Sequence, residues 1–174
     1  MNAALQNLLT RRSCRKYTGE QIKPEELDAI LEAGTYAPTG RGLQTPVIVA
    51  IQDPDTLREV ERLNARVTGD ENAKTFYGAP AVIVVFGIRG NALSLADGNL
   101  VLGNLVNAAN AVGVDSCYIW RAEEAFDSEE GKALMRKWGV PENYRGIGNV
   151  ILGYGVPEGK RAAAPRKEGY IIKI

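Results

Sequence analysis

Residues 81–88 read Ala-Val-Ile-Val-Val-Phe-Gly-Ile and lie within the longest apolar run of the chain. The run is nearly continuous in β-branched residues, which is typical of a strand buried on both faces of a sheet. It is shorter than the ~18 residues that a membrane span requires. We therefore predict a central strand at 81–88 and no membrane partner.

On either side of this strand, predicted helices alternate with predicted strands along the chain. Apolar runs predict further strands at 46–52, 114–120, 147–152 and 170–174. Helical spacing and start signals predict helices at 2–10, from Pro24, from Pro54, at 94–112 and from Ser128 to Trp138. Single strands between helices indicate a mixed α/β or an α+β sandwich on a central sheet. Since no linker or repeat interrupts the pattern, we expect one domain over residues 1–174.

Composition excludes several classes of function. Lys plus Arg and Asp plus Glu number 21 each, so the zero net charge does not favour a nucleic-acid partner. The chain has no histidine, which excludes Ser-His-Asp and Cys-His catalysis and argues against a zinc or non-haem iron site. Cys14 and Cys117 lie too far apart in the sequence for a redox or metal motif, and we expect two unrelated thiols. Without a signal-peptide pattern at the N-terminus, we expect a cytoplasmic protein.

A dense basic cluster occupies residues 11–16, Arg-Arg-Ser-Cys-Arg-Lys, directly after the first predicted helix. Arginine forks and a serine hydroxyl suit a compact dianion such as a terminal phosphate. Two plainer interpretations exist, a solvated basic turn and a patch for nucleic acid. Cations also favour the C-terminal end of a helix, which offers a structural reason for part of the cluster.

Two other segments have more than one interpretation. The loop at residues 38–44 is rich in glycine and small polar residues, so it either approaches a ligand closely or simply connects two elements. The predicted helix at 94–112 is apolar most of the way round, which fits a core helix and a dimer-interface helix equally. We expect Asp97 to cap the first turn of that helix rather than to catalyse a reaction.

Four separated segments, taken in order, carry a family resemblance. They are Arg-Arg-Ser-x-Arg-x-Tyr at 11–17, the loop 37–44, Phe-Tyr-Gly-Ala-Pro at 76–80, and Leu-Gly-Tyr at 152–154 followed by Pro-Arg-Lys at 165–167. Together they resemble the nitroreductase family of FMN-dependent oxidoreductases, over nearly the whole chain. The resemblance implies an α+β, nitroreductase-like sandwich with a central mixed β-sheet flanked by helices. It also implies a homodimer in which the C-terminal strand joins the partner's sheet.

The resemblance further implies which residues hold FMN, with each site built from both subunits. The residues expected from one subunit are Arg11, Arg12, Ser13 and Arg15, with the C-terminal cations Arg166 and Lys167 at the phosphate. The residues expected from the other subunit are Pro38, Thr39, Gly40 and Gln44. Asn72 falls where the family places an amide on the pyrimidine edge of the flavin, and Ile119, Trp120 and Arg121 correspond to the stretch near flavin N5. Lys16 is expected to be an exposed bystander.

The chain departs from the family pattern beside the loop glutamine. The family has Asn two residues before that glutamine and often Pro-Trp after it, whereas this chain has Gly42 and then Thr45-Pro46-Val47. Gly42 removes one flavin or substrate contact. The chain is also short for the family, which leaves little room for helices that narrow substrate choice.

The implied activity is electron transfer from NADH or NADPH through flavin N5 to a small organic acceptor, such as a nitroaromatic or a quinone, by a ping-pong mechanism. A bound flavin supplies the chemistry, so no catalytic side chain is expected and the absence of histidine is no obstacle. Two alternatives remain: a flavin-binding or flavin-processing protein with other chemistry, such as dehalogenation or flavin consumption, and a non-enzymatic dimeric binding module.

Overall fold

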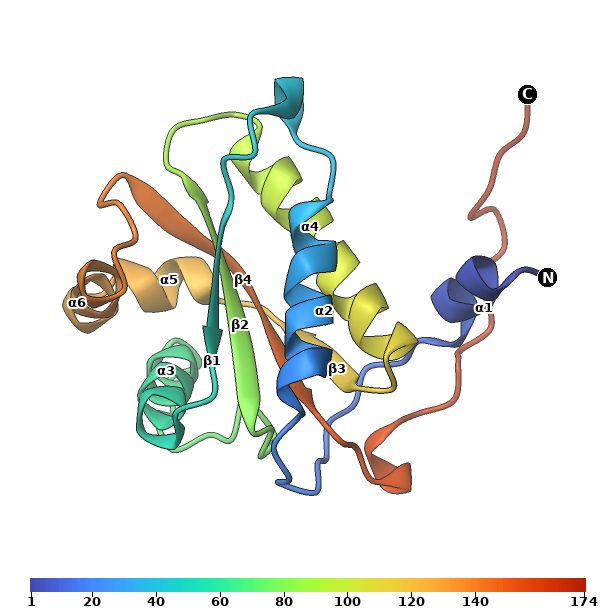
Figure 1. The fold of residues 1–174 in the computed structure, drawn as a ribbon, viewed down its shortest axis with the longest axis horizontal. Coiled ribbons are helices and arrows are strands. Elements are labelled where there is room, and N and C mark those ends of the chain that lie inside the picture. The colour runs from blue at the N-terminus through green and yellow to red at the C-terminus, as the bar shows by residue number, and fades with distance from the viewer.

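The computed structural model describes residues 1–174 and is built on a four-stranded sheet. The strands are β1 (Val47–Ile51), β2 (Ala81–Ile88), β3 (Asp115–Ile119) and β4 (Tyr144–Gly153), in the spatial order β1-β2-β4-β3 (Figure 1). All three neighbouring pairs are antiparallel. The predicted α+β fold is therefore confirmed, and the four strands of one chain are paired antiparallel.

The run at 81–88 forms β2, which lies in the interior of the sheet, as predicted for a strand that is apolar on both faces. Val82, Val84 and Phe86 belong to one hydrophobic cluster, and Ala81, Ile83 and Val85 belong to the other. Side chains alternate between the two faces of a strand, so the near-continuous apolar run places one set in each layer. The strand thus joins two cores that lie on opposite sides of the sheet.

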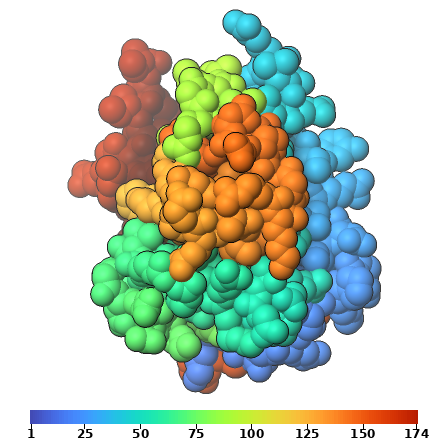
Figure 2. Space-filling view, turned by 90° about the vertical axis from the view of Figure 1, so that its left-hand side faces the viewer, coloured from blue at the N-terminus to red at the C-terminus, as the bar shows by residue number.

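Two helix layers cover the sheet. On one face lie α2 (Pro24–Thr35) and α4 (Ser94–Ala111), and on the other lie α3 (Pro54–Arg66), α5 (Ala122–Asp127) and α6 (Glu129–Lys137) (Figure 1). Figure 2 faces the second layer and shows α3 beside the α5–α6 segment. The predicted helix starts are confirmed where a side chain caps the first turn: Asp53 accepts from the Thr56 N–H at 2.9 Å, and Ser128 accepts from the Gly131 N–H at 3.0 Å.

Two elements differ from the sequence prediction. The short helix α5 was not predicted, because its six residues are too few to display a helical period. Residues 170–174 were predicted to form a strand, yet they pair with nothing in the chain and are exposed. A strand forms only where a neighbour supplies hydrogen-bond partners, and no sheet edge of the same chain meets these residues.

Apolar side chains remain uncovered on one side of the molecule. Helix α1 (Ala3–Thr10) buries none of its residues, and its Leu5, Leu8 and Leu9 are exposed. Helix α4 packs one face against the sheet and leaves Leu95 and Leu100 exposed on the other. The α4 helix is therefore a core helix that also presents an apolar outer face. No helix of the chain combines the length and the apolar character needed to cross a bilayer.

Gly131 in α6 permits the close contact between α5 and α6, and we expect Gly131→Ala to destabilise the fold. A methyl group at this position would lie 2.4 Å from the Ala125 carbonyl oxygen and 2.6 Å from the Phe126 Cα. Both are backbone atoms, so the helices must separate, at a cost of about 1–3 kcal/mol in the free energy of unfolding. Urea denaturation measures this difference. Lys132→Ala on the same turn is the control, and an equally stable Gly131→Ala protein would contradict the packing argument.

Candidate functional site

The basic segment is held as an added strand-like edge beside β3. Ser13 bridges Ser116 in a parallel sense, and the Cys14 N–H donates to the Ser116 carbonyl at 2.9 Å. On the other side, the Arg15 N–H donates to the Gly159 carbonyl at 2.9 Å. Residues 13–15 are thus fixed between β3 and the 155–160 segment, which includes the 3₁₀ turn η2 (Pro157–Gly159).

Cys14 anchors this edge through close packing. Its side chain is fully buried, and a methyl group on Gly155 or Gly159 would come within 2.5 or 2.8 Å of its sulfur. Side chains of neighbouring residues in an extended segment point to opposite sides, so the exposed Arg15 faces away from the buried thiol. Cys14 and Cys117 are both free thiols, which confirms the expectation that they form no disulfide.

The positive charge of the segment is not compensated by any carboxylate. None of the ion pairs of the chain includes Arg11, Arg12 or Arg15. Burial raises the pKa of the Cys14 thiol, and burial together with the nearby Cys14 raises the pKa of the Tyr17 phenol above its usual range. Both acids therefore stay neutral at physiological pH and add no negative charge to the cluster.

Arg12 has a structural role in addition to its charge. Its Nη1 donates to the Leu9 carbonyl at 2.8 Å and to the Arg11 carbonyl at 2.7 Å. These carbonyls belong to the C-terminal end of α1, where a cation is favourable. Part of the Arg12 guanidinium therefore caps α1. This agrees with the structural reason for cations at the C-terminal end of a helix that the sequence suggested.

A hollow of about 180 Å³ lies next to this edge and includes Arg15. Its walls come from Arg15, from residues 117–121 at the end of β3, and from Thr75 and Tyr77. The structure therefore brings Arg15 together with Ile119, Trp120 and Arg121, as the resemblance implied. Ligand pockets usually exceed about 300 Å³. The hollow in one chain is thus smaller than a typical ligand pocket.

The second group of predicted residues lies at the loop after α2. Thr39 and Gln44 line a hollow of about 150 Å³ there, and both also line a shallower one of about 620 Å³ that includes Pro38. No residue lines both these hollows and the one at Arg15. In Figure 1 this loop, with its 3₁₀ turn η1 (Gly40–Gly42), stands at the top edge of the molecule, beyond the end of α2. The two halves of the predicted site are separate within one chain.

Asp97 holds this loop, which corrects the expectation that it caps its own helix. Its side chain is 5% exposed, and its Oδ1 accepts the Gly40 N–H at 3.0 Å. Gly40 also packs closely against the Leu93 side chain, since a methyl group there would lie 2.4 Å from Leu93 Cδ1. The loop is therefore fixed to the start of α4 by one hydrogen bond and one close contact.

We expect Asp97→Ala to release the loop. The Gly40 N–H loses its acceptor, and an unpaired buried group of this kind costs about 1–3 kcal/mol. Amide hydrogen exchange at Gly40 should then accelerate at least about tenfold, since 1.4 kcal/mol is a factor of ten. Asp97→Asn keeps a carbonyl oxygen at the same position and serves as the control. Unchanged exchange at Gly40 in Asp97→Ala would show that the bond does not hold the loop.

The four non-glycine residues with positive φ all lie in these two regions. Arg41 and Gln44 belong to the loop after α2, with φ of 57° and 51°. Tyr77 and Arg121 line the hollow beside Arg15, with φ of 53° and 76°. Residues other than glycine adopt this region at a cost, and such strained positions cluster at functional sites. This concentration is independent support for both halves of the site.

Three predicted residues stand outside both halves in one chain. Asn72 is exposed, and its N–H donates to Asp70 Oδ1 at 3.0 Å. Arg166 and Lys167 lie in the exposed C-terminal segment, where Arg166 donates to the Ala164 carbonyl and Lys167 Nζ lies 5.5 Å from the centre of the Tyr170 ring. None of these interactions involves the basic segment.

Sequence comparison places the chain among known proteins. The sequence model of the nitroreductase family matches residues 8–154. This chain belongs to the nitroreductase family. A putative NADH dehydrogenase/NAD(P)H nitroreductase of Archaeoglobus fulgidus is 29% identical over 163 residues, covering 88% of this chain and 86% of the relative.

Two solved structures of nitroreductases with bound FMN are similar to the whole chain. The one from Bacteroides fragilis has a TM-score of 0.89 and 30% identity, with all of both chains covered. The one from Desulfitobacterium hafniense has a TM-score of 0.86 and 25% identity, covering 100% of this chain and 99% of its own. The fold implied by the resemblance is thereby confirmed.

The structure of this nitroreductase-family chain adds residues that were not singled out from the sequence. Thr75, Tyr77 and Tyr118 line the hollow with Arg15. Tyr77 belongs to the 76–80 segment that contributed to the family resemblance, so the sequence offered a reason to consider it as a site residue. No pattern distinguishes Thr75 or Tyr118 from ordinary loop and strand residues. Burial, and next the nearby Glu124, raise the pKa of Tyr118, which keeps this wall of the hollow uncharged.

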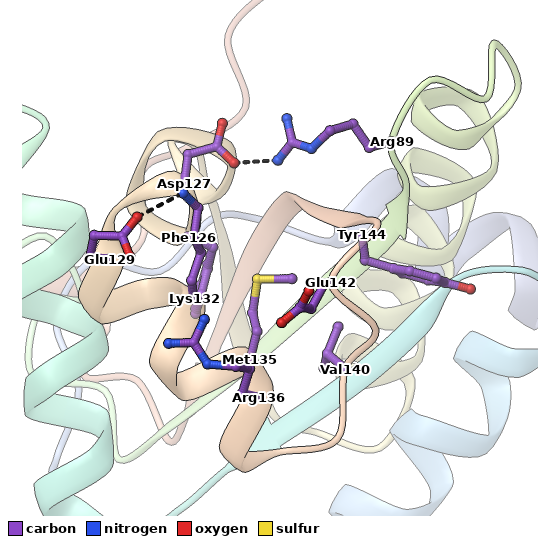
Figure 3. Close-up of a pocket in the computed structure, with 10 residues that line it drawn as sticks. All are labelled: Arg89, Phe126, Asp127, Glu129, Lys132, Met135, Arg136, Val140, Glu142 and Tyr144. Atoms are coloured by element: carbon purple, nitrogen blue, oxygen red, sulfur yellow. Dashed lines mark hydrogen bonds and ion pairs between the residues drawn. The ribbon is translucent and has the colours of Figure 1, made fainter.

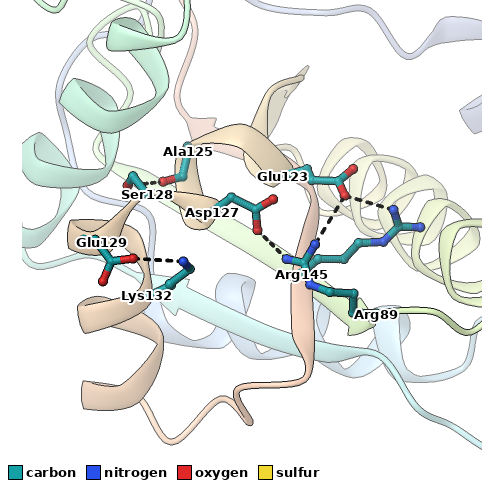
Figure 4. A network of polar contacts seen from close by, with 8 residues as sticks. All are labelled: Arg89, Glu123, Ala125, Asp127, Ser128, Glu129, Lys132 and Arg145. Carbon is teal, nitrogen blue, oxygen red and sulfur yellow. Dashed lines mark hydrogen bonds and ion pairs between the residues drawn. The ribbon is translucent and has the colours of Figure 1, made fainter.

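A different hollow, of about 580 Å³, lies over α5 and α6 and contains none of the predicted site residues (Figure 3). Its charged rim is largely neutralised internally: Arg89 pairs with Asp127, and Lys132 Nζ lies 2.9 Å from Glu129 Oε1 (Figure 4). Arg145, behind the rim, lies 3.0 Å from Glu123. Arg136 also lines the hollow, as does Glu142, so the three cations of the lining are matched by three carboxylates. The hollow therefore has no excess of positive charge for a phosphate, in contrast to the basic segment.

Proposed function

We propose that this chain is an FMN-dependent oxidoreductase that uses NADH or NADPH and a small organic acceptor such as a nitroaromatic or a quinone. The observation that carries the proposal is the set of arginines without carboxylate partners, held on the edge of β3 beside the hollow at Arg15. The names of the relatives point the same way, since two similar structures hold FMN and the archaeal relative is named as an NAD(P)H nitroreductase.

The residues of this chain fit the cofactor chemically. Arg11, Ser13 and Arg15 would bind the phosphate, because guanidinium and hydroxyl donors match its oxygens and no carboxylate competes for them. Arg12 would contribute charge while its Nη1 caps α1. The Trp120 indole, which is 68% exposed at the hollow, offers an aromatic surface for a planar ring. When bound, FMN supplies hydride and electron transfer between the nicotinamide donor and the acceptor.

We further propose that the working unit is a homodimer. The Arg15 hollow is smaller than a typical ligand pocket, and the loop with Pro38, Thr39 and Gln44 lies elsewhere in the same chain, so a second copy would bring the two halves together. The exposed leucines of α1 and the outer face of α4 would be covered by that copy. Exposed apolar side chains that gather on neighbouring elements often mark an interface.

We propose that the C-terminal tail lies on the sheet edge of a second copy. β1 and β3 are the outer strands of the sheet, and the basic segment already occupies the outer side of β3. Along β1 runs a hollow of about 540 Å³ lined by residues 48–53 with Thr56 and Trp138. Residues 170–174 would add a strand to that edge of the partner, bringing Arg166 and Lys167 to the partner's side of the dimer.

The absorbance spectrum of the freshly purified protein tests the cofactor. We expect peaks of oxidised flavin, and anaerobic bleaching on addition of NADH or NADPH. Reoxidation by a panel of nitroaromatics and quinones then tests the acceptor class. A colourless protein whose spectrum does not respond to added FMN would overturn the proposal, while a flavin that neither nicotinamide reduces would indicate another flavin chemistry.

A further inference from the structure

Two buried asparagines hold the backbone that ends β3 at the hollow. Asn149 on β4 donates from Nδ2 to the Ile119 carbonyl at 3.2 Å. Asn64 on α3 donates from Nδ2 to the Trp120 carbonyl at 2.7 Å. Each asparagine is only 1% exposed. Two consecutive carbonyls are thus held from two elements far apart in the sequence.

These bonds decide which way the next N–H groups point. In a planar trans peptide the carbonyl and the following N–H point in opposite directions. Because the Ile119 and Trp120 carbonyls point to the buried amides, the N–H groups of Trp120 and Arg121 point away from them. Trp120 and Arg121 both line the hollow beside Arg15, and their N–H groups have no partner in the chain.

Packing alone does not explain the two asparagines. A carbonyl only accepts hydrogen bonds, so each side chain must present its Nδ2 and leave Oδ1 for another partner. Both Oδ1 atoms are buried and have no partner in the chain. An unpaired buried acceptor is unfavourable for stability, and an apolar side chain of similar size would avoid it. The left-handed Arg121, with φ of 76°, is a second unfavourable feature of the same turn.

We propose that Asn64 and Asn149 are positioning residues that fix the Trp120 and Arg121 N–H groups as a pair of donors to an acceptor on the edge of the flavin ring. The inference rests on the proposed function, because it takes FMN as the ligand of this hollow. The asparagines do not touch the ligand and act through the backbone between them.

Single replacements by leucine, Asn64→Leu and Asn149→Leu, test the proposal. We expect each to raise the FMN dissociation constant about five- to tenfold, because one well-placed hydrogen bond contributes a factor of this order. Fluorescence titration of the apoprotein with FMN measures the constant. Asn104→Leu is the matched control, since Asn104 Nδ2 donates to the Ala33 carbonyl at 3.0 Å and does not contact residues 119–121. It should stay within about twofold of the parent protein.

The response of the Trp120 and Arg121 amide resonances to FMN is a second measurement. It would not change if the two asparagines served only the stability of the fold. In the parent protein, FMN should shift the Trp120 and Arg121 amide signals and slow their hydrogen exchange, and the leucine variants should lose both effects. Asn64→Ala and Asn149→Ala serve if the leucine variants do not fold, because alanine removes the donor without adding bulk to the buried site. Unchanged binding and unchanged amide shifts in the variants would overturn this inference and leave the proposed function intact. A parent protein that binds no FMN would overturn both.

Discussion

Replacing Arg15 by alanine is expected to weaken FMN binding about 10- to 100-fold. A charge-assisted hydrogen bond contributes about 1.5–3 kcal/mol, and 1.4 kcal/mol corresponds to a factor of ten. Arg15 lines the hollow and pairs with no carboxylate, while its backbone bond to Gly159 survives the substitution. The loss should therefore come from the ligand and not from the fold. Fluorescence titration of the apoprotein with FMN measures it.

Lys16→Ala is the matched control for Arg15→Ala. Lys16 is the next residue, is exposed, carries the same charge and does not line the hollow. Its removal should change the FMN dissociation constant by no more than about twofold at physiological ionic strength, because exposed charges outside direct contact are strongly screened. Equal losses in the two variants would mean that the segment acts only through its general charge. Arg15→Lys should recover part of the affinity, since it restores the charge without the planar fork.

Deleting residues 170–174 is expected to convert a dimer into a monomer and to release the flavin at the same time. Tyr170, Ile171, Ile172 and Ile174 are exposed in one chain, and β1 offers an unpaired edge on which a partner's tail can lie. If each site takes Arg15 from one subunit and the loop with Gln44 from the other, loss of the dimer removes one set of contacts. We expect FMN affinity to fall roughly tenfold or more, since even one lost contact of ~1.4 kcal/mol has that effect.

Analytical ultracentrifugation with detection at flavin wavelengths follows both changes in one experiment. Lys173→Ala is the control within the tail, because it keeps the apolar residues and the backbone bonds of the strand. It should remain dimeric and hold FMN. A truncated protein that stays dimeric would show that the tail is not an interface element, and a monomer that retains full FMN affinity would contradict the shared site.

The fold was predictable from the sequence where a local pattern of residues determines the structure. Residues 81–88 became β2 with the predicted bounds, since a near-continuous apolar run has no exposed face and must lie between two layers. Asp53 and Ser128 cap helices because their side chains reach an N–H three residues ahead, which depends only on neighbouring sequence. At the basic segment, Arg15 lies beside residues 119–121, an arrangement that the family resemblance implied and that no local pattern indicates.

Other features depended on contacts between distant segments. Strand order and direction follow from how the connecting segments cross the sheet, which no local pattern records, so the order β1-β2-β4-β3 with antiparallel pairs came only from the structure. Asp97 was expected to cap its own helix, yet it binds Gly40, which lies 57 positions away along the chain. Nothing in the local sequence of Asn64 indicates a bond to Trp120, since the partner is brought there only by packing of α3 near the end of β3.

The sequence by itself determined the central strand buried on both faces and most helix boundaries, because these depend on hydrophobic periodicity and on side chains that act within a few residues. The family was indicated separately, by the resemblance of four motifs. The tertiary structure alone decided which carbonyls the buried asparagines hold, which loop Asp97 fixes and which N–H groups stay unpaired at the hollow. A hydrogen bond requires its two atoms to lie about 3 Å apart, and for segments distant in sequence only the packed fold sets that distance.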